Sequence, residues 1–381
     1  MTAATHRLLL GAVAALLALP PTTMAAGDPL KADLVFSNLT GADQLCLRDG
    51  TGEYVCGDLA EGAAGARAIA TGDVNGDGAL DVVLGRGPDQ LNRLCRGDGA
   101  GSFTCSDIGT IPATTSAIAL GDLNGDGTLD AVFGTGAHQR SQVCLGDGTG
   151  KFACDEIDSV GGETHAVAIG DVNGDGAPDI VFAREGTPSQ VCLGDGTGAF
   201  TCTAISPNAD DTFGIALGDV NHDGKLDAVL ANVERMPDRA NPQHNRVCLG
   251  DGAGHFDCHD VSTGSYRSTA VALGDLDRDG NLDAVFANTN QGSSQACFGD
   301  GHGDFDCRRI DPKDSSSSGL ALVDLDGNRT LDIVFASAIV HRGEHNRACL
   351  GDGHGAFDCR DITADLFDSS GVATGKLTPP R

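Results

Sequence analysis

The stretch STAVALGDLDRDGNLDAVFANTNQGSSQACFGDGHGDFDCRRI, residues 268–310, alternates four short strand-like segments with turns rich in Gly, Asp and Asn. The segments are Thr269–Asp275, Leu282–Asn288, Gln295–Gly299 and Asp304–Cys307. The last two flank a glycine-rich turn, as in a β-hairpin. The stretch therefore predicts a four-stranded antiparallel unit.

Cysteine pairs mark seven copies of this unit along the 381 residues. The two cysteines of each pair are ten residues apart, and the pairs are Cys46/Cys56, Cys95/Cys105, Cys144/Cys154, Cys192/Cys202, Cys248/Cys258, Cys297/Cys307 and Cys349/Cys359. They recur every 48 to 56 residues, and a period near 50 with strand-like content indicates a propeller or a solenoid. Small residues in the first segment suit the innermost strand of a propeller blade, and the apolar second segment suits a strand covered on both faces.

The cysteine spacing predicts one disulfide inside each hairpin. If the hairpin folds symmetrically about its turn, Cys144 lies opposite Cys154 and Gly146 opposite Phe152. Opposed residues on antiparallel strands have Cα atoms about 4.5 to 5.5 Å apart, which a disulfide accepts. In the chain-entropy model each eleven-residue ring stabilises the fold by roughly 2 to 3 kcal/mol.

The two ends of the chain carry complementary parts of one unit. Val372–Leu377 matches the first segment at Ile69–Val74, and Ala32–Asn38 matches the second segment at Leu282–Asn288. Pairing these ends closes a ring and removes the exposed sheet edges. We therefore predict an all-β, seven-bladed propeller of four-stranded blades, closed by the N- and C-terminal strands in one shared blade.

The N-terminus is typical of an export signal. His6 and Arg7 precede an apolar run from Leu8 to Pro20 and then small residues, a run too short for the roughly 20 residues that span a bilayer. We expect a signal peptide at 1–26 and a single propeller at 27–381; the alternative is a retained membrane anchor. The cysteines suit a secreted, periplasmic or cell-surface chain, because disulfides persist in oxidising compartments, and the C-x2-C spacing of thiolate metal sites is absent.

The composition is strongly acidic. The chain has 54 acidic and 25 basic residues, a formal charge of -29. Its summed field repels phosphate, so nucleic acid and anionic lipid are poor partners and bound cations are more natural ones. No segment after the N-terminal run predicts stable membrane insertion.

Six acidic loops between the first and second segments are candidate cation sites. They span residues 72–81, 121–130, 170–179, 218–227, 274–283 and 323–332. Loop positions are counted from the second residue of each span, so that Asp73 is position 1 and Asp81 is position 9 of the first loop. Side-chain oxygens at positions 1, 3, 5 and 9, with a main-chain carbonyl at position 7, suit Ca²⁺ better than Mg²⁺, which keeps several waters. The alternative is ordinary Asp/Asn/Gly turns, although six such clusters of carboxylates would repel without a cation. The predicted ligands are Asp73, Asn75, Asp77, Ala79, Asp81, Asp122, Asn124, Asp126, Thr128, Asp130, Asp171, Asn173, Asp175, Ala177, Asp179, Asp219, Asn221, Asp223, Lys225, Asp227, Asp275, Asp277, Asp279, Asn281, Asp283, Asp324, Asp326, Asn328, Thr330 and Asp332.

The loops are not equal. The fifth loop is the most highly charged, whereas the sixth has Asn328 at position 5 and Arg329 at position 6, where a glycine favours the sharp turn. In the shared blade Lys376 falls at position 1 and Asp33 at position 9. We expect no calcium there, and a Lys376–Asp33 ion pair in its place.

These loops, the following FG or FAN and the GDGxGxF turn resemble the FG-GAP or VCBS repeat family, the calcium-loop propellers of integrin α-subunits and many bacterial surface and secreted proteins. The resemblance covers the whole mature chain and implies the same fold and calcium loops. A cysteine pair in every blade is not part of the general family pattern. In similar proteins, enzymes usually carry their catalytic residues in a separate domain.

No constellation of residues predicts catalysis. The GDG turns lack the lysine and helix of a phosphate loop, and G-x-S-x-G and H-E-x-x-H are absent. His244 and His345 recur in similar contexts, which repeat similarity explains more simply than a metal or acid–base role. We therefore expect a protein without enzymatic activity.

Topology predicts two different rims. The acidic loops and GDGxG turns share one rim, and the opposite rim carries connections of variable length, the longest being Asn232–Arg246. Nine of 20 arginines fall in these connections: Arg86, Arg93, Arg140, Arg184, Arg235, Arg239, Arg246, Arg342 and Arg347. They either balance local acidic residues or form a face for an acidic partner.

The sequence favours an exported, calcium-binding, adhesion-like module for an extracellular protein or glycan. A lectin is the alternative, although sugar sites commonly stack on aromatic rings and the chain has no Trp and only Tyr54 and Tyr266 as tyrosines. A calcium-dependent polysaccharide lyase is a third possibility.

Overall fold

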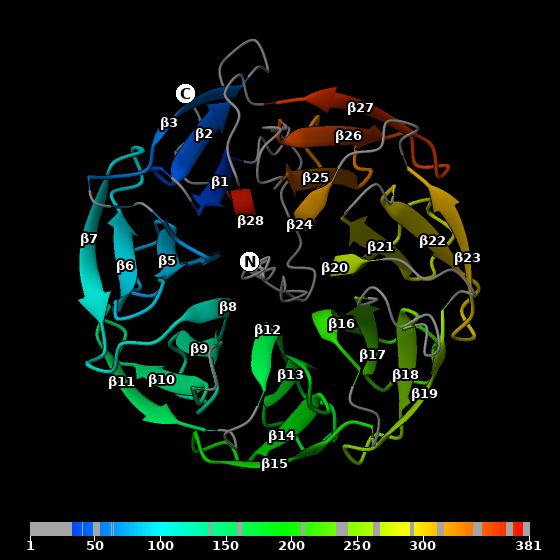
Figure 1. The fold of residues 1–381 in the computed structure, drawn as a ribbon, viewed down its shortest axis with the longest axis horizontal. Helices are drawn as coiled ribbons and strands as arrows, with labels where there is room; N and C mark the ends of the chain where they lie inside the picture. The colour runs from blue at the N-terminus through cyan, green and yellow to red at the C-terminus, as the bar shows by residue number, and fades with distance from the viewer. Residues whose placement is uncertain are drawn as a thin grey trace, which may run out of the picture.

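The computed structural model describes residues 33–39, 41–48, 54–61, 63, 65–136, 139–157, 162–206, 210–233, 243–261, 267–289, 293–310, 316–337, 345–362 and 369–375. Seven four-stranded antiparallel sheets surround a central axis as the blades of a propeller (Figure 1). The predicted signal peptide lies outside the described residues. Within them, no helix has the length and apolar character needed to cross a bilayer.

Each blade uses its strands in one order from the axis outward. Blades 1 to 6 begin at β4, β8, β12, β16, β20 and β24, and the closing blade begins at β28. The first strands are β4 (Ala68–Gly72), β8 (Thr115–Gly121), β12 (Glu163–Gly170), β16 (Thr212–Gly218), β20 (Ser268–Gly274), β24 (Ser317–Val323) and β28 (Ser369–Gly375). The second strands are β5 (Asp81–Gly85), β9 (Asp130–Thr135), β13 (Asp179–Glu185), β17 (Asp227–Asn232), β21 (Asp283–Asn288), β25 (Asp332–Ser337) and β1 (Asp33–Asn38).

The outer two strands of each blade form the predicted hairpin. The third strands are β6 (Asn92–Gly97), β10 (Gln142–Gly146), β14 (Gln190–Gly194), β18 (Arg246–Gly250), β22 (Gln295–Gly299), β26 (Arg347–Gly351) and β2 (Gln44–Arg48). The fourth strands are β7 (Phe103–Ile108), β11 (Phe152–Glu156), β15 (Phe200–Ala204), β19 (Phe256–Asp260), β23 (Phe305–Arg309), β27 (Phe357–Asp361) and β3 (Tyr54–Asp58).

The ring closes in the shared blade as predicted. β28 pairs antiparallel with β1, with Asp33 opposite Gly375 and Phe36 opposite Val372. Figure 1 shows the C-terminal β28 lying beside the N-terminal β1 on the inner side of the ring. Lys376 lies outside the described residues, so its expected ion pair with Asp33 stays a prediction.

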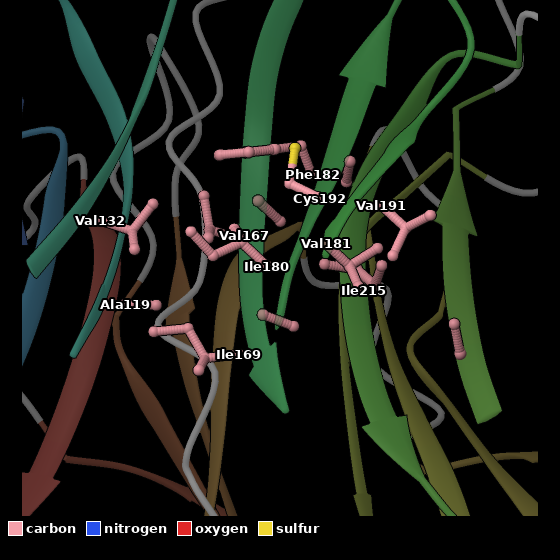
Figure 2. Close-up of a cluster of buried hydrophobic side chains, with 14 of the residues drawn as sticks. Ala119, Val132, Val167, Ile169, Ile180, Val181, Phe182, Val191, Cys192 and Ile215 are labelled. Atoms are coloured by element: carbon pink, nitrogen blue, oxygen red, sulfur yellow. The ribbon is translucent and has the colours of Figure 1, made fainter. Parts of the chain in front are cut away.

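The core lies between neighbouring blades rather than inside one blade. The second strands are buried on both faces, and Phe36, Phe133, Phe182 and Phe286 are among the largest fully buried side chains. One cluster joins Val132 of blade 2, Phe182 of blade 3 and Ile215 of blade 4 (Figure 2). No single sheet buries its own apolar faces, so the blades stabilise one another.

All seven disulfides form inside hairpins. Cys144 lies opposite Cys154 and Gly146 opposite Phe152, in the predicted register. The Cα–Cα distances are 3.8–4.0 Å, shorter than the expected 4.5–5.5 Å. The covalent link joins directly opposed residues, so it sets the spacing of the two strands there. No described cysteine is free, which indicates an oxidising environment.

A hydroxyl at a β-bulge in the first strand joins several blades to the next. Ser116 Oγ donates to the carbonyl of Thr164 at 2.6 Å, and Ser318 Oγ donates to that of Ser369 at 2.7 Å. Thr269 and Ser370 make the equivalent bonds to Ser317 and Ala66. In each case the bulged residue is the one skipped by the strand register.

Candidate functional site

The aspartate at position 9 anchors each of the six acidic loops. In the fifth loop, Asp283 is buried; its Oδ2 accepts from the N–H of Leu276 at 2.7 Å and its Oδ1 from the N–H of Gly299 at 2.9 Å. The same two bonds, to loop position 2 and to the last glycine of the third strand, recur at Asp81, Asp130, Asp179, Asp227 and Asp332. This residue therefore ties the acidic loop to the outer hairpin.

The aspartate at position 1 shapes the turn itself. In the first loop, Asp73 Oδ1 accepts from the N–H of Asp77 at 3.1 Å, and Oδ2 accepts from that of Gly78 at 2.8 Å. In the first three loops the position-3 amide also donates to the position-5 carboxylate, as Asn75 does to Asp77. These loops hold a folded turn through their own hydrogen bonds.

The fifth and sixth loops bring three carboxylates together. Oxygens of Asp275, Asp277 and Asp283 lie within 4.8 Å of one another, and the same holds for the residues at positions 1, 3 and 9 of the sixth loop, Asp324, Asp326 and Asp332. Asp275 Oδ1 is buried and has no hydrogen-bond donor within the described chain. Burying a carboxylate oxygen without a hydrogen-bond donor costs free energy. These residues therefore fit a hard cation that takes oxygen ligands.

Asp279, at position 5 of the fifth loop, is not among the three clustered carboxylates of that loop. Asp279 instead accepts from the main-chain and side-chain N–H groups of Asn281, both at 2.8 Å. In the first four loops position 3 is an asparagine, which lowers the negative charge of the cluster. The predicted ligands therefore lie along six loops of similar structure. The most closely grouped carboxylates are those of the fifth and sixth loops.

Burial alters the acidity of the anchoring aspartates. The pKa of Asp283 and of Asp332 is raised to about 6, chiefly by desolvation and to a smaller extent by nearby loop carboxylates, against opposing backbone hydrogen bonds. Desolvation likewise raises the pKa of Asp81, Asp130, Asp179 and Asp227. Burial therefore makes these groups bind protons more readily, and a bound cation would oppose this by favouring the ionised form.

The stability of the metal-free protein should fall as the pH rises from about 4 to about 6. The folded pKa of these aspartates is above the unfolded value, so the folded state binds more protons in that window. Urea unfolding of dialysed, metal-free protein at several pH values measures this slope. Calcium-saturated protein is the control, because cation binding favours the ionised carboxylates; a metal-free free energy of unfolding that rises over this window would contradict the prediction.

Loop position 4 needs a left-handed backbone, which the sequence analysis missed. Gly76 has φ of 71° in the first loop, and His222 and Arg278 adopt φ of 59° and 63° at the same position. Both long side chains reach the next blade: His222 Nε2 lies 2.9 Å from Asn281 Oδ1, and an Arg278 guanidinium nitrogen donates to the carbonyl of Asn328. The sequence signal that could have revealed this conformation is the glycine found at position 4 in the other four loops.

Arg329 adopts the turn that glycine makes elsewhere, with φ of 67°. The left-handed conformation costs a non-glycine residue about 1–2 kcal/mol, and the greater freedom of unfolded glycine offsets part of this. We expect Arg329→Gly to increase the free energy of unfolding by about 0.5–1 kcal/mol, measured by urea unfolding. Arg329→Ala is the matched control, since it removes the side chain and keeps the backbone cost; equal stability of the two variants would refute the explanation.

Several arginines of the opposite rim are neutralised by neighbouring acidic residues. Arg93 lies 3.8 Å from Asp107, and Arg347 lies 3.2 Å from Asp361. Arg246 lies 3.1 Å from Asp210 and also faces Asp260. These pairs favour local charge balance over a uniformly positive face. Arg235, Arg239 and Arg342 lie outside the described residues, as does most of the longest connection.

A hollow of about 250 Å³ opens on this rim between blades 1 and 2. Ile111 and Pro112, from the connection between the blades, form its apolar side. Ala113 and Gln139 also line it, together with the side chains of Arg140, Gln142 and Glu156 of blade 2. The hollow therefore offers hydrogen-bonding groups of both charges beside a small apolar surface.

Comparison with known proteins identifies the repeated unit. The profile of the FG-GAP-like repeat matches residues 73–133 and 171–230, and each match begins at position 1 of an acidic loop. The chain carries FG-GAP-like repeats. The predicted resemblance is thereby confirmed together with the seven-bladed architecture. No curated protein sequence matches the chain.

Solved structures share this fold at low sequence identity. A lectin of Agrocybe aegerita that recognises non-reducing terminal N-acetylglucosamine is 19% identical, covers 92% of this chain and 93% of its own, and has a TM-score of 0.62. The periplasmic gluconolactonase PpgL of Pseudomonas aeruginosa is 16% identical, with 90% and 98% covered and a TM-score of 0.60. A Lactobacillus plantarum protein is 11% identical, with 91% and 99% covered and a TM-score of 0.64. Similarity at this level shows the fold alone.

Proposed function

We propose that this chain is an exported, calcium-stabilised propeller that binds an extracellular protein or glycan and has no enzymatic activity. The observation that carries the proposal is the contrast between the two rims. One rim repeats the same acidic loop six times, with the anchoring aspartate bonded alike in each. The other rim carries connections that differ from blade to blade, as recognition loops on rigid scaffolds do.

Calcium is the proposed cofactor of the acidic rim. The buried, donor-free Asp275 Oδ1 and the three clustered carboxylates support the fifth loop as an occupied site. The bound ion would supply charge neutralisation and oxygen cross-linking within the loop. The residues of the chain then position the hairpins and keep the variable rim rigid.

Affinity capture with the whole protein tests the binding role. The immobilised chain is exposed to extracellular material from its source organism, with calcium and with chelator. A partner retained in calcium and released by chelator supports the proposal. A preparation with scrambled disulfides is the control. If it captures the same partner as the native protein does, binding does not require the folded rim and the proposal is wrong.

A glycan ligand is the second candidate, and the hollow between blades 1 and 2 favours it. Its Arg140, Gln142 and Glu156 side chains suit sugar hydroxyls, and Ile111 offers apolar contact. The lectin with the same fold is a reason to include terminal N-acetylglucosamine in a glycan array. Binding that Arg140→Ala abolishes would favour this candidate, and an array without any bound glycan would remove it.

A further inference from the structure

Three side chains of blade 3 meet at the rim opposite the acidic loops. Glu163, His165 and Glu185 each offer a ligand atom, and these atoms lie within 4.8 Å of one another. His165 Nε2 lies 2.6 Å from Glu185 Oε2. His165 is only 6% exposed, whereas Glu163 is half-buried. The cluster is thus held by the fold and is open to solvent on one side.

The cluster occurs where the repeat pattern changes. His165 occupies the bulge of β12, the position at which Ser116, Thr269, Ser318 and Ser370 join other blades to the next. The His165 ring stacks on Phe213 of blade 4, with ring centroids 3.9 Å apart and an interplanar angle of 13°. The stack fixes the plane of the imidazole. A hydroxyl fills this bulge in four blades, whereas His165 and Phe213 fill it in blades 3 and 4. Such a departure from a repeated pattern is typical of a functional site.

Charge provides an independent argument. Glu163 and Glu185 are directly opposed on β12 and β13, and like charges in that arrangement repel. Asp211, in the connection before β16, adds a further carboxylate near enough to interact with His165. A cation held by Glu163, His165 and Glu185 would remove the repulsion between the two opposed glutamates.

We propose that Glu163, His165 and Glu185 form a Zn²⁺ site of a different kind from the acidic loops. Imidazole with carboxylate suits zinc, whereas Ca²⁺ takes six to eight oxygen ligands. Three protein ligands leave one coordination position for water or for a ligand group, as in zinc sites that bind substrates. The eight residues of β12 separate this site from the third acidic loop by about 23 Å, so the two kinds of site bind independently.

Zinc binding to the untagged, calcium-saturated full chain tests the proposal. Equilibrium dialysis should find one tight zinc per chain, which raises the melting temperature by mass action. His165→Ser should weaken this affinity by more than the roughly 10- to 100-fold cost of losing an outer-shell partner. Serine is the residue at this bulge in other blades, so this variant should fold. His255→Ser, at an 81% exposed side chain, is the matched control and should bind zinc as the wild type does.

Cobalt gives a second readout that a merely structural histidine would not affect. The wild type should give the visible absorption of Co²⁺ held by nitrogen and oxygen ligands, and both His165→Ser and Glu185→Gln should lose it. If neither zinc nor cobalt binds tightly, or if His165→Ser binds as well as His255→Ser, the cluster is an ion pair between His165 and Glu185 and the proposal is wrong.

Discussion

Removing calcium should lower the melting temperature of this protein by more than about 10 °C. Each cation bound only by the folded chain adds about 2.7 kcal/mol at a concentration 100 times its dissociation constant, and six loops act together. Without cations, the clustered carboxylates of the fifth and sixth loops repel one another across less than 4.8 Å. Differential scanning calorimetry with calcium and with excess chelator measures the shift.

A single-loop variant makes this prediction specific. Asp275→Ala removes the buried oxygen that has no donor, so elemental analysis should find one calcium fewer per chain. Asp257→Ala, on the exposed face of β19, is the control and should keep all the calcium. An unchanged melting temperature in chelator, with no calcium found in the purified protein, would show that the loops are ordinary turns.

Deleting the closing strand should destabilise the chain by about 5–10 kcal/mol and expose an aggregating edge. A chain ending at Asp368 loses all of β28, including buried Val372 and Ala373 and the pairing with β1. It also loses the hydroxyl bonds that Ser318 and Ser370 make around the closing blade. Urea unfolding and size-exclusion chromatography measure the effect.

Two further chains control for the deletion. A chain ending at Leu377 keeps β28 and should match the full-length protein. Val372→Asp, which buries one charge in the closing blade, should cost about 4 kcal/mol or more without shortening the chain. If the chain ending at Asp368 stays monomeric and as stable as the one ending at Leu377, the ring does not depend on closure by its ends.

The covalent and strand-level features of the fold were predictable because they are local. Two cysteines ten positions apart, with a glycine-rich turn between them, leave one symmetric hairpin register, and that register is observed for Cys144 and Cys154. The pairing of β1 with β28 joins distant segments, and it was predictable for another reason: each end carried a complementary part of a pattern repeated elsewhere in the chain.

Parts of the acidic loops could not be predicted from the sequence. The periodic carboxylates were evident, but the second bond of Asp283, to Gly299, joins residues that only the folded blade brings together. Likewise, the sequence showed an arginine at position 329 without showing that the backbone would still adopt the left-handed turn there. Local sequence constrains a turn, whereas the surrounding blade determines whether a non-glycine residue must bear its conformational cost.

The sequence by itself determined the repeat, the hairpin disulfides and the acidic rim, which follow from spacing within about 50 residues. It also determined the closure of the ring, which follows from the complementary parts of one unit at the two ends of the chain. Only the tertiary structure decided which charges meet. Arg246 lies 3.1 Å from Asp210, which is in the connection before β16, and Glu163, His165 and Glu185 converge from two strands beside Phe213 of another blade. Such contacts depend on the connections between strands, on the bulge of β12 and on the packing of one blade against the next, and none of these is encoded in the spacing of the residues concerned.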